Sequence, residues 1–263
     1  MTATITPITT YSWLRLWSLY SRELRRFMNV SMQTVFAPVI TTLIFLTVFA
    51  IALGRAERTV AGVPYLEFLA PGLIAMAILQ NSFANTSSSL MTAKMQGNIV
   101  DTLMPPLTPI QLIIGYAFSG ATRGLLVACM VTTAMSFFVN FTLHNFLIII
   151  FYATNAALML AMLGMISGIW ADKHEYNSAV TNFVIMPLSF LSGSFYSIER
   201  LPESFQTFAH LNPFFYLIDG FRYGFIGHAD GSIEIGITAI LSINLTLAFV
   251  CYRIFKTGYK LKP

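Results

Sequence analysis

The chain alternates between long apolar runs and short polar stretches. A helix that crosses a membrane needs roughly 20 mainly apolar residues, and six runs reach that length. They are residues 33–53, 67–90, 110–138, 145–170, 177–196 and 233–255. Pro187 and Gly193 interrupt the fifth run. The pattern predicts an all-α membrane protein with six transmembrane helices, folded as a single transmembrane domain over residues 1–263.

The stretch before the first run has a different pattern. Over residues 11–27, bulky apolar side chains recur at helical spacing, and four arginines occupy the rest of the helix surface. Such a stretch is too short and too charged to span a membrane. It predicts an amphipathic helix lying in the inner membrane interface, with its arginines toward anionic lipid. The helix is either a plain anchor or a surface that also touches a cytoplasmic partner.

The segment between the last two runs is too aromatic for a free loop and too broken for a spanning helix. Aromatic rings favour the depth of the membrane interface, and re-entrant backbone is tolerated where protein covers it. The first helix would start at Pro202. Asn212 and Pro213 would form a turn, since proline biases the preceding residue away from helix. We therefore predict a short re-entrant helical hairpin over residues 198–227.

Composition supports a membrane protein. The 263 residues are 56% hydrophobic and 10% charged, whereas soluble domains carry about 25% charged residues. A nucleic-acid partner would require a basic groove on a soluble fold, so none is expected, and membrane lipid is the expected surrounding. Cys129 and Cys251 lie inside apolar runs without metal-ligand spacing, so neither a metal site nor a disulfide is predicted.

The distribution of basic residues predicts the orientation. Six spans put both termini on one side, and cytoplasmic loops carry the excess of Lys and Arg. With the termini inside, ten basic residues are cytoplasmic: eight near the termini plus Lys94 and Lys173. Four are outside, namely Arg55, Arg58, Arg200 and Arg222. We expect a multi-pass protein of the bacterial inner membrane with both termini in the cytoplasm.

Catalytic motifs are missing from the sequence. There is no GxxxxGK[ST] phosphate loop, no HExxH, no GxSxG and no clustered Cys/His set. A phosphate loop is the usual means of binding ATP for hydrolysis. The chain is therefore not expected to be an enzyme or to hold a cofactor or metal itself. Any energy for work would come from an ion gradient or from another subunit.

Two short loops face the cytoplasm in this topology. In the loop 91–109, residues 94–103 can form a short helix that the following prolines end. Such a helix can transmit a push from a partner into the membrane, or it is a passive connector. The second loop, 171–176, carries Asp172 and His174, which form a solvated cap if they contact no partner.

Polar side chains also occur inside the spans. Asn81 and Asn85 begin a polar stripe on one face of the second span, and Arg123 lies deep in the third. In hydrocarbon, such groups turn toward other helices or a wet pathway. The stripe therefore serves helix packing or a transport path, and Arg123 is expected either to pair with a polar group or to lie in that path. Gly164 and Gly168 form a GxxxG pattern that predicts close helix approach.

Residues 186–225, MPLSFLSGSFYSIERLPESFQTFAHLNPFFYLIDGFRYGF, resemble the C-terminal signature of type-2 ATP-binding cassette (ABC) exporter permeases. In that family an FLSG-like turn ends a span, and LP, NP with aromatics and an Arg follow. The matching positions are Pro187, Leu191, Gly193, Leu201, Pro202, Asn212, Pro213 and Arg222. The run QGNIVDTLMPPLTP is similar to the family's first coupling helix, with Gln96 where an acidic residue is common.

The resemblance covers nearly the whole chain, and it implies a permease subunit of an exporter. A homodimer of permeases would bind two separate ATPase subunits, which hold ATP and Mg, and would move an amphipathic or lipid-linked substrate outward. The residues expected to contact the ATPase are Gln96, Gly97, Asp101, Leu103, Asp172 and His174. The expected pathway residues are Asn81, Asn85 and Arg123.

The outer hairpin is the expected gate, because its aromatic side chains can repack between two arrangements over amphipathic cargo. Asp219 and Arg222 are three residues apart on its second helix, so we expect them to pair on one face. The predicted gate residues are Pro202, Asn212, Pro213, Asp219 and Arg222. The alternative is that the pair only stabilises the fold.

Two other functions compete with export. A gradient-driven secondary transporter would need acidic side chains embedded in its spans, whereas the acids of this chain are expected at loops and span ends: Glu67, Asp101, Asp172, Asp219 and Glu234. A non-transporting membrane scaffold has no need of a cytoplasmic coupling loop. The sequence therefore favours the exporter permease.

Overall fold

Five of the six predicted spans are confirmed as helices long and apolar enough to cross a membrane. The computed structural model describes residues 8–53, 59–60, 62–103 and 107–261. Among these residues, the five helices are Met32–Ala52, Tyr65–Met95 (α3), Pro109–Met135 (α5), Phe146–Trp170 (α6) and Ile233–Thr257 (α11). The first consists of a π-helical turn, η1 (Met32–Phe36), followed by α2 (Ala37–Leu53).

Local capping sets where several of these helices begin. Thr108 accepts a hydrogen bond from the Gln111 backbone N–H while the Gln111 side chain accepts one from the Thr108 backbone, and Pro109 occupies the first turn of α5. The Asn145 side chain accepts from the first free N–H groups of α6. These caps satisfy donors that a helix end leaves without partners, so polar residues beside each apolar run fix its start.

The helix α3 forms the centre of the bundle and is buried along most of its length. It packs against α5, α6 and α10 (Pro213–Ile226). The approach of α6 is close at the predicted GxxxG pair: a Cβ on Gly168 would lie 2.6 Å from the Ser87 carbonyl oxygen of α3. A similar clash with the α3 backbone would occur at Gly164. Small residues thus let the two backbones touch, as the spacing predicts.

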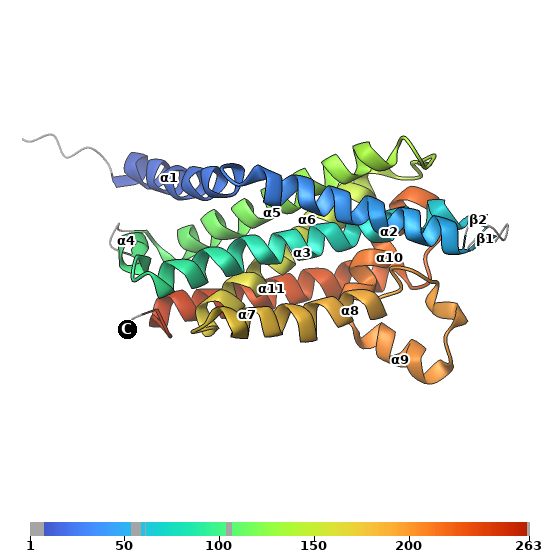
Figure 1. Cartoon of the computed structure of the whole chain (residues 1–263). Coiled ribbons are helices and arrows are strands. Elements are labelled where there is room, and N and C mark those ends of the chain that lie inside the picture. The colour runs from blue at the N-terminus through green and yellow to red at the C-terminus, as the bar shows by residue number, and fades with distance from the viewer. Residues whose placement is uncertain (1–7, 54–58, 61, 104–106, 262–263) are drawn as a thin grey trace, which may run out of the picture.

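The fifth predicted span is helical but divided. It consists of α7 (His174–Val180), a π-helical turn η2 (Thr181–Ile185) and α8 (Met186–Leu191). Pro187 follows η2 and lacks the N–H that a regular helix would use. The wide turn accommodates this, with the Met186 N–H donating to the Thr181 carbonyl. The run lies lengthwise along the bundle (Figure 1), but it is not among the five helices long and apolar enough to cross a membrane.

The two ends of the bundle differ. At one end lie the short helix α4 (Ile99–Leu103) and the C-terminal end of α11 (Figure 1). At the other lie the hairpin strands β1 (Thr59–Val60) and β2 (Val63–Pro64), the 3₁₀ turn η3 (Ile198–Arg200) and α9 (Glu203–Leu211). Two short helices, α9 and α10, occupy the segment in which a re-entrant hairpin is predicted. Of these, α10 is packed into the bundle, whereas most of α9 is exposed.

The N-terminal amphipathic helix is present as α1 (Ile8–Met28), but its orientation differs from the prediction. It continues the direction of α2 and packs against α5 (Figure 1), instead of turning into a plane across the bundle. Tyr20 hydrogen-bonds to Thr122 of α5 at 2.9 Å. Trp13 and Trp17 are exposed on the outer face. Polar contacts to the spans, which helical spacing does not reveal, fix this orientation.

Candidate functional site

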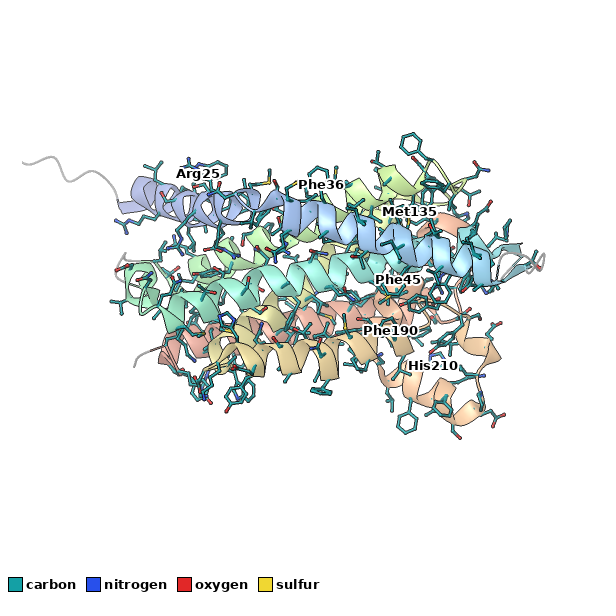
Figure 2. The ribbon with its side chains drawn as sticks, in the orientation of Figure 1. Arg25, Phe36, Phe45, Met135, Phe190 and His210 are labelled. Atoms are coloured by element: carbon teal, nitrogen blue, oxygen red, sulfur yellow. The ribbon has the colours of Figure 1, made fainter. Side chains whose placement is uncertain are left out.

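A groove runs along α3 between two helical walls. Its volume is about 400 Å³. One wall is α2 and the other is the run formed by η2 and α8, and the floor comes from α3. Its lining includes Pro38, Thr41, Phe45, Ala77, Asn81 and Phe190. Figure 2 labels Phe45 and Phe190, one on each wall. The lining is mainly apolar with a few polar groups, which is the composition of a site for an amphipathic molecule.

The predicted polar stripe joins the groove to a buried network. Asn81, on the groove floor, accepts a hydrogen bond from the Arg123 guanidinium at 3.2 Å. The expected pairing of Arg123 with a polar group is therefore confirmed. Asn85, one turn further along α3, donates to the Ser119 hydroxyl at 3.2 Å. The structure thus brings Asn81 and Arg123 together, whereas Asn85 contacts a different residue of α5, Ser119.

Glu23 belongs to this network, and the sequence reasoning missed it. Its carboxylate is buried in α1 and accepts hydrogen bonds from Arg26 at 3.0 Å and from Ser89 at 2.6 Å. Arg26 also donates to both the side-chain and main-chain oxygens of Asn85, at 2.9 and 2.8 Å. The signal was present in the sequence, because Glu23 is the one acidic residue among the arginines of residues 11–27.

The predicted cytoplasmic loops meet at the α4 end of the bundle. Asp172 accepts hydrogen bonds from Lys94 at 2.6 Å and from Lys260 at 3.0 Å. Hydrogen bonds from these two ammonium groups hold the pKa of the exposed Asp172 carboxyl below its usual value. The C-terminal end of α3, the loop after α6 and the chain beyond α11 are thereby joined. A pocket of about 310 Å³ lies among them, lined partly by Gly97, Val100 and Asp172.

The other coupling residues surround this pocket. Gly97 has φ +73°, a left-handed conformation that glycine adopts without strain, and it directs the chain into α4. Gln96 is exposed and accepts a hydrogen bond from Asn98 at 3.3 Å. Asp101 and His174 are exposed. Leu103 is the last residue of α4, and its side chain lies outside the described part. The exposed residues form a surface that is open to a partner.

At the opposite end, Arg222 holds the turn that follows α8. Its guanidinium donates to the Gly193 carbonyl at 2.5 Å and lies 3.9 Å from the centre of the Phe68 ring. The side chain is almost fully buried. The Asn212 side chain donates to the Leu188 carbonyl at 2.8 Å. Two predicted gate residues therefore fix the same turn.

The expected pairing of Asp219 with Arg222 is wrong. Within the described part of the chain, no ion pair joins these side chains. The Asp219 carboxylate instead accepts backbone N–H bonds from Asp230 and Gly231, both at 3.0 Å. The helical spacing put the two residues on one side of α10, but neighbouring loops supply nearer partners. Pro202 and Pro213 sit where predicted, at the starts of α9 and α10.

The bundle of long apolar helices, with a groove along its central helix and a polar surface at one end, is the architecture of a multi-pass membrane protein. Comparison with known proteins agrees. The sequence profile of the ABC-2 type transporter family matches residues 15–226. The chain is 34% identical over 250 residues to the inner membrane transport permease YadH of Escherichia coli K12, covering 95% of this chain and 98% of that protein. It belongs to the ABC-2 type transporter family.

More distant relatives are also similar over most of their length. Nodulation protein J of Sinorhizobium fredii is 24% identical over 241 residues, which cover 90% of each chain. Nodulation protein J of Rhizobium leguminosarum bv. viciae is 26% identical over 237 residues, covering 87% of this chain and 88% of that protein. Like YadH, the chain is a multi-pass inner membrane permease.

Proposed function

We propose that this chain is the transmembrane subunit of an ABC exporter, which moves an amphipathic or lipid-linked substrate outward across the inner membrane. ATP hydrolysis on a separate ATPase subunit drives the movement, and two copies of the permease bind two ATPase subunits. Family membership implies an ATPase partner. The observation that supports the substrate class is the groove along α3, because its apolar lining carries polar groups at a few positions only.

The cytoplasmic end supports coupling to a partner. The ion pairs of Asp172 with Lys94 and Lys260 join three segments of the chain beside α4. A push on α4 would therefore reach α3, α6 and α11 together. A passive connector has no need of these cross-links. Both termini are placed in the cytoplasm in this proposal, with Gly97, Asp101, Asp172 and His174 on the surface facing the ATPase.

The buried acids of the structure give little support to the alternative, a gradient-driven transporter. An acid that carries protons has to exchange them with water during the cycle. Glu23 is closed off by Arg26 and Ser89, and Asp219 is held by two backbone N–H groups. Both carboxylates are already fully engaged in holding helices and loops together, which favours an energy source outside this chain.

The proposal is tested with the permease and its ATPase co-expressed, purified together and reconstituted into proteoliposomes. We expect ATP hydrolysis to require the ATPase subunit and export of amphipathic cargo to require both. A tryptophan at Thr41, on the groove wall, should block export while the complex still assembles. The matched control is Ile44→Trp, on an exposed part of α2 outside the groove lining. Equal export by both variants would show that the cargo does not pass through the groove. ATP hydrolysis by the purified permease alone would contradict the proposal that a separate subunit hydrolyses ATP.

A further inference from the structure

Three metal-ligating side chains meet at the outer end of the molecule. Glu199 lies in η3, and His228 and Asp230 lie in the loop between α10 and α11. One ligand atom from each lies within 4.8 Å of the others. The three come from two segments about thirty residues apart in the sequence, so the fold, and not local spacing, brings them together. None of them belongs to the predicted gate residues.

The Asp230 carboxylate is held in a fixed position. Its side chain is 2% exposed. One oxygen accepts the Ser197 hydroxyl at 3.0 Å and the other accepts the Ile198 backbone N–H at 2.7 Å. His228 Nε2 lies 3.4 Å from Asp230 Oδ1 and is partly exposed. The Asp230 carboxylate would therefore be a rigid metal ligand. The partly exposed His228 imidazole leaves a route by which an ion can enter from water.

The local charge favours a cation. Asp219, also buried, accepts hydrogen bonds from the backbone N–H groups of Asp230 and Gly231, so a second buried carboxylate lies against the main chain of this loop. The buried guanidinium nearby is that of Arg222. Two buried negative groups against one buried positive group leave an excess of negative charge in this part of the described structure. Buried charges are stable when they are paired or coordinate a metal.

We propose that Glu199, His228 and Asp230 bind a zinc-class divalent cation at the outer end of the permease. Zinc binds imidazole nitrogen and carboxylate oxygen at about 2.1 Å, so tetrahedral ligand atoms lie roughly 3.4 Å apart. The His228–Asp230 separation already has that value. The exposed Glu199 side chain completes the set by rotating toward them, and water takes the fourth position. The imidazole ligand selects zinc-class ions over Ca²⁺ and Mg²⁺, which prefer all-oxygen sites.

Binding would join the turn after α8 to the loop before α11. Ser197 and Ile198 already contact Asp230, and the ion adds Glu199 and His228 to the same link. The outer segment that precedes α9 would then be held more firmly to the end of α10. Zinc therefore acts as a stabiliser of the outer end, and the stabilisation depends on zinc concentration.

The test uses the full chain, purified in detergent without a histidine tag and stripped with a chelator. Zn²⁺ is titrated by competition with a chromogenic chelator, and Co²⁺ is added separately to follow its visible absorption. We expect one Zn²⁺ per chain, not displaced by millimolar Mg²⁺, and a rise in melting temperature on binding. Glu199→Gln and His228→Ala should each weaken binding by at least about 10-fold, as loss of a group that supports a metal typically does.

The controls are Glu203→Gln and His210→Ala, which change an exposed carboxylate and an exposed imidazole in nearby α9. They should bind Zn²⁺ like the unaltered chain. Because Glu199 is exposed, its glutamine variant should fold normally, and gel filtration checks this. Equal Zn²⁺ affinity in the Glu199 and His228 variants and their controls would overturn the proposal. So would the absence of one-to-one binding by the unaltered chain, leaving His228 and Asp230 as an ion pair only.

Discussion

Arg222 donates a hydrogen bond to the main-chain carbonyl of Gly193, 29 residues earlier in the chain, at 2.5 Å. The same guanidinium packs over the Phe68 ring of α3. One buried side chain therefore joins α10, α3 and the turn that ends α8. This contact holds the α9 end of the bundle, and among the described residues the Asp219–Arg222 pair that helical spacing predicts is not formed.

Arg222→Ala should destabilise the outer end strongly. It removes the donor to the Gly193 carbonyl and leaves that buried group without its partner, which costs about 1–3 kcal/mol. Asp219→Asn should cost less, since the amide oxygen still accepts a backbone N–H. Thermal unfolding in detergent ranks the two variants, and export is measured beside the level of folded protein. Export that falls only in proportion to folded protein would make Arg222 structural and remove it from the gate.

Gly97→Val should separate ATP hydrolysis from export while the protein still inserts. A branched residue at φ +73° costs about 1–2 kcal/mol of backbone strain, and the chain would relax by moving the start of α4. Gly62→Val is the matched control, because Gly62 has φ +78° in the outer hairpin. Gly97→Asn should restore coupling, since asparagine tolerates this conformation. Coupling is measured as the ratio of cargo exported to ATP hydrolysed. Equal ratios for Gly97→Val and Gly62→Val would show that α4 is only a connector.

Asp172→Asn should loosen the link between α3, α6 and the chain after α11. The pKa of Asp172 is lowered by its lysine partners, so its contribution is complete above the unfolded value of about 3.9. It is lost as the pH falls through the lower folded value. At neutral pH the wild-type link is intact and weakens with salt, because the carboxylate is exposed. The strength of this link is measured by hydrogen exchange of residues 258–261. Glu175→Gln, at an exposed position, is the control. Identical exchange in Asp172→Asn and Glu175→Gln would contradict the prediction.

Glu23→Ala should release α1 from the bundle. It leaves Arg26 without its carboxylate partner, and we expect a loss of about 2 kcal/mol, moderated because Arg26 is one-third exposed. Arg25→Ala, one residue from Arg26 on an exposed face, should change stability little. Limited proteolysis of α1 and thermal unfolding report the effect. Similar cleavage of the two variants would mean that apolar contacts alone hold α1.

Cysteine labelling tests the proposed orientation. A cysteine at Ser204 in α9 should react with an impermeant reagent in intact cells, whereas cysteines at Lys94 and His174 should not, because the basic loops are expected inside. After cell lysis, the exposed His174 position should react and show that its cysteine is accessible. Labelling of that position in intact cells would reverse the orientation.

Five of the spans were predictable because the length and apolar character of each run belong to a single segment, and about 20 apolar residues favour a spanning helix. The close approach at Gly168 was predictable from the GxxxG spacing of small residues. The partners of Asp219 and Arg222 were not, because an i,i+3 contact competes with loop groups that only the fold brings near. The sequence likewise does not predict that Glu199 lies close to His228 and Asp230, because only the fold brings their two segments together.

Both walls of the groove contain one wide helical turn, and each turn comes just before a proline, Pro38 in one wall and Pro187 in the other. Such a turn holds one extra residue, and one residue of a helix corresponds to about 100° of rotation. The extra residue therefore turns the part of each wall beyond the wide turn by about 100° relative to a regular helix. The two prolines and their wide turns thereby help to set which side chains of each wall face the groove.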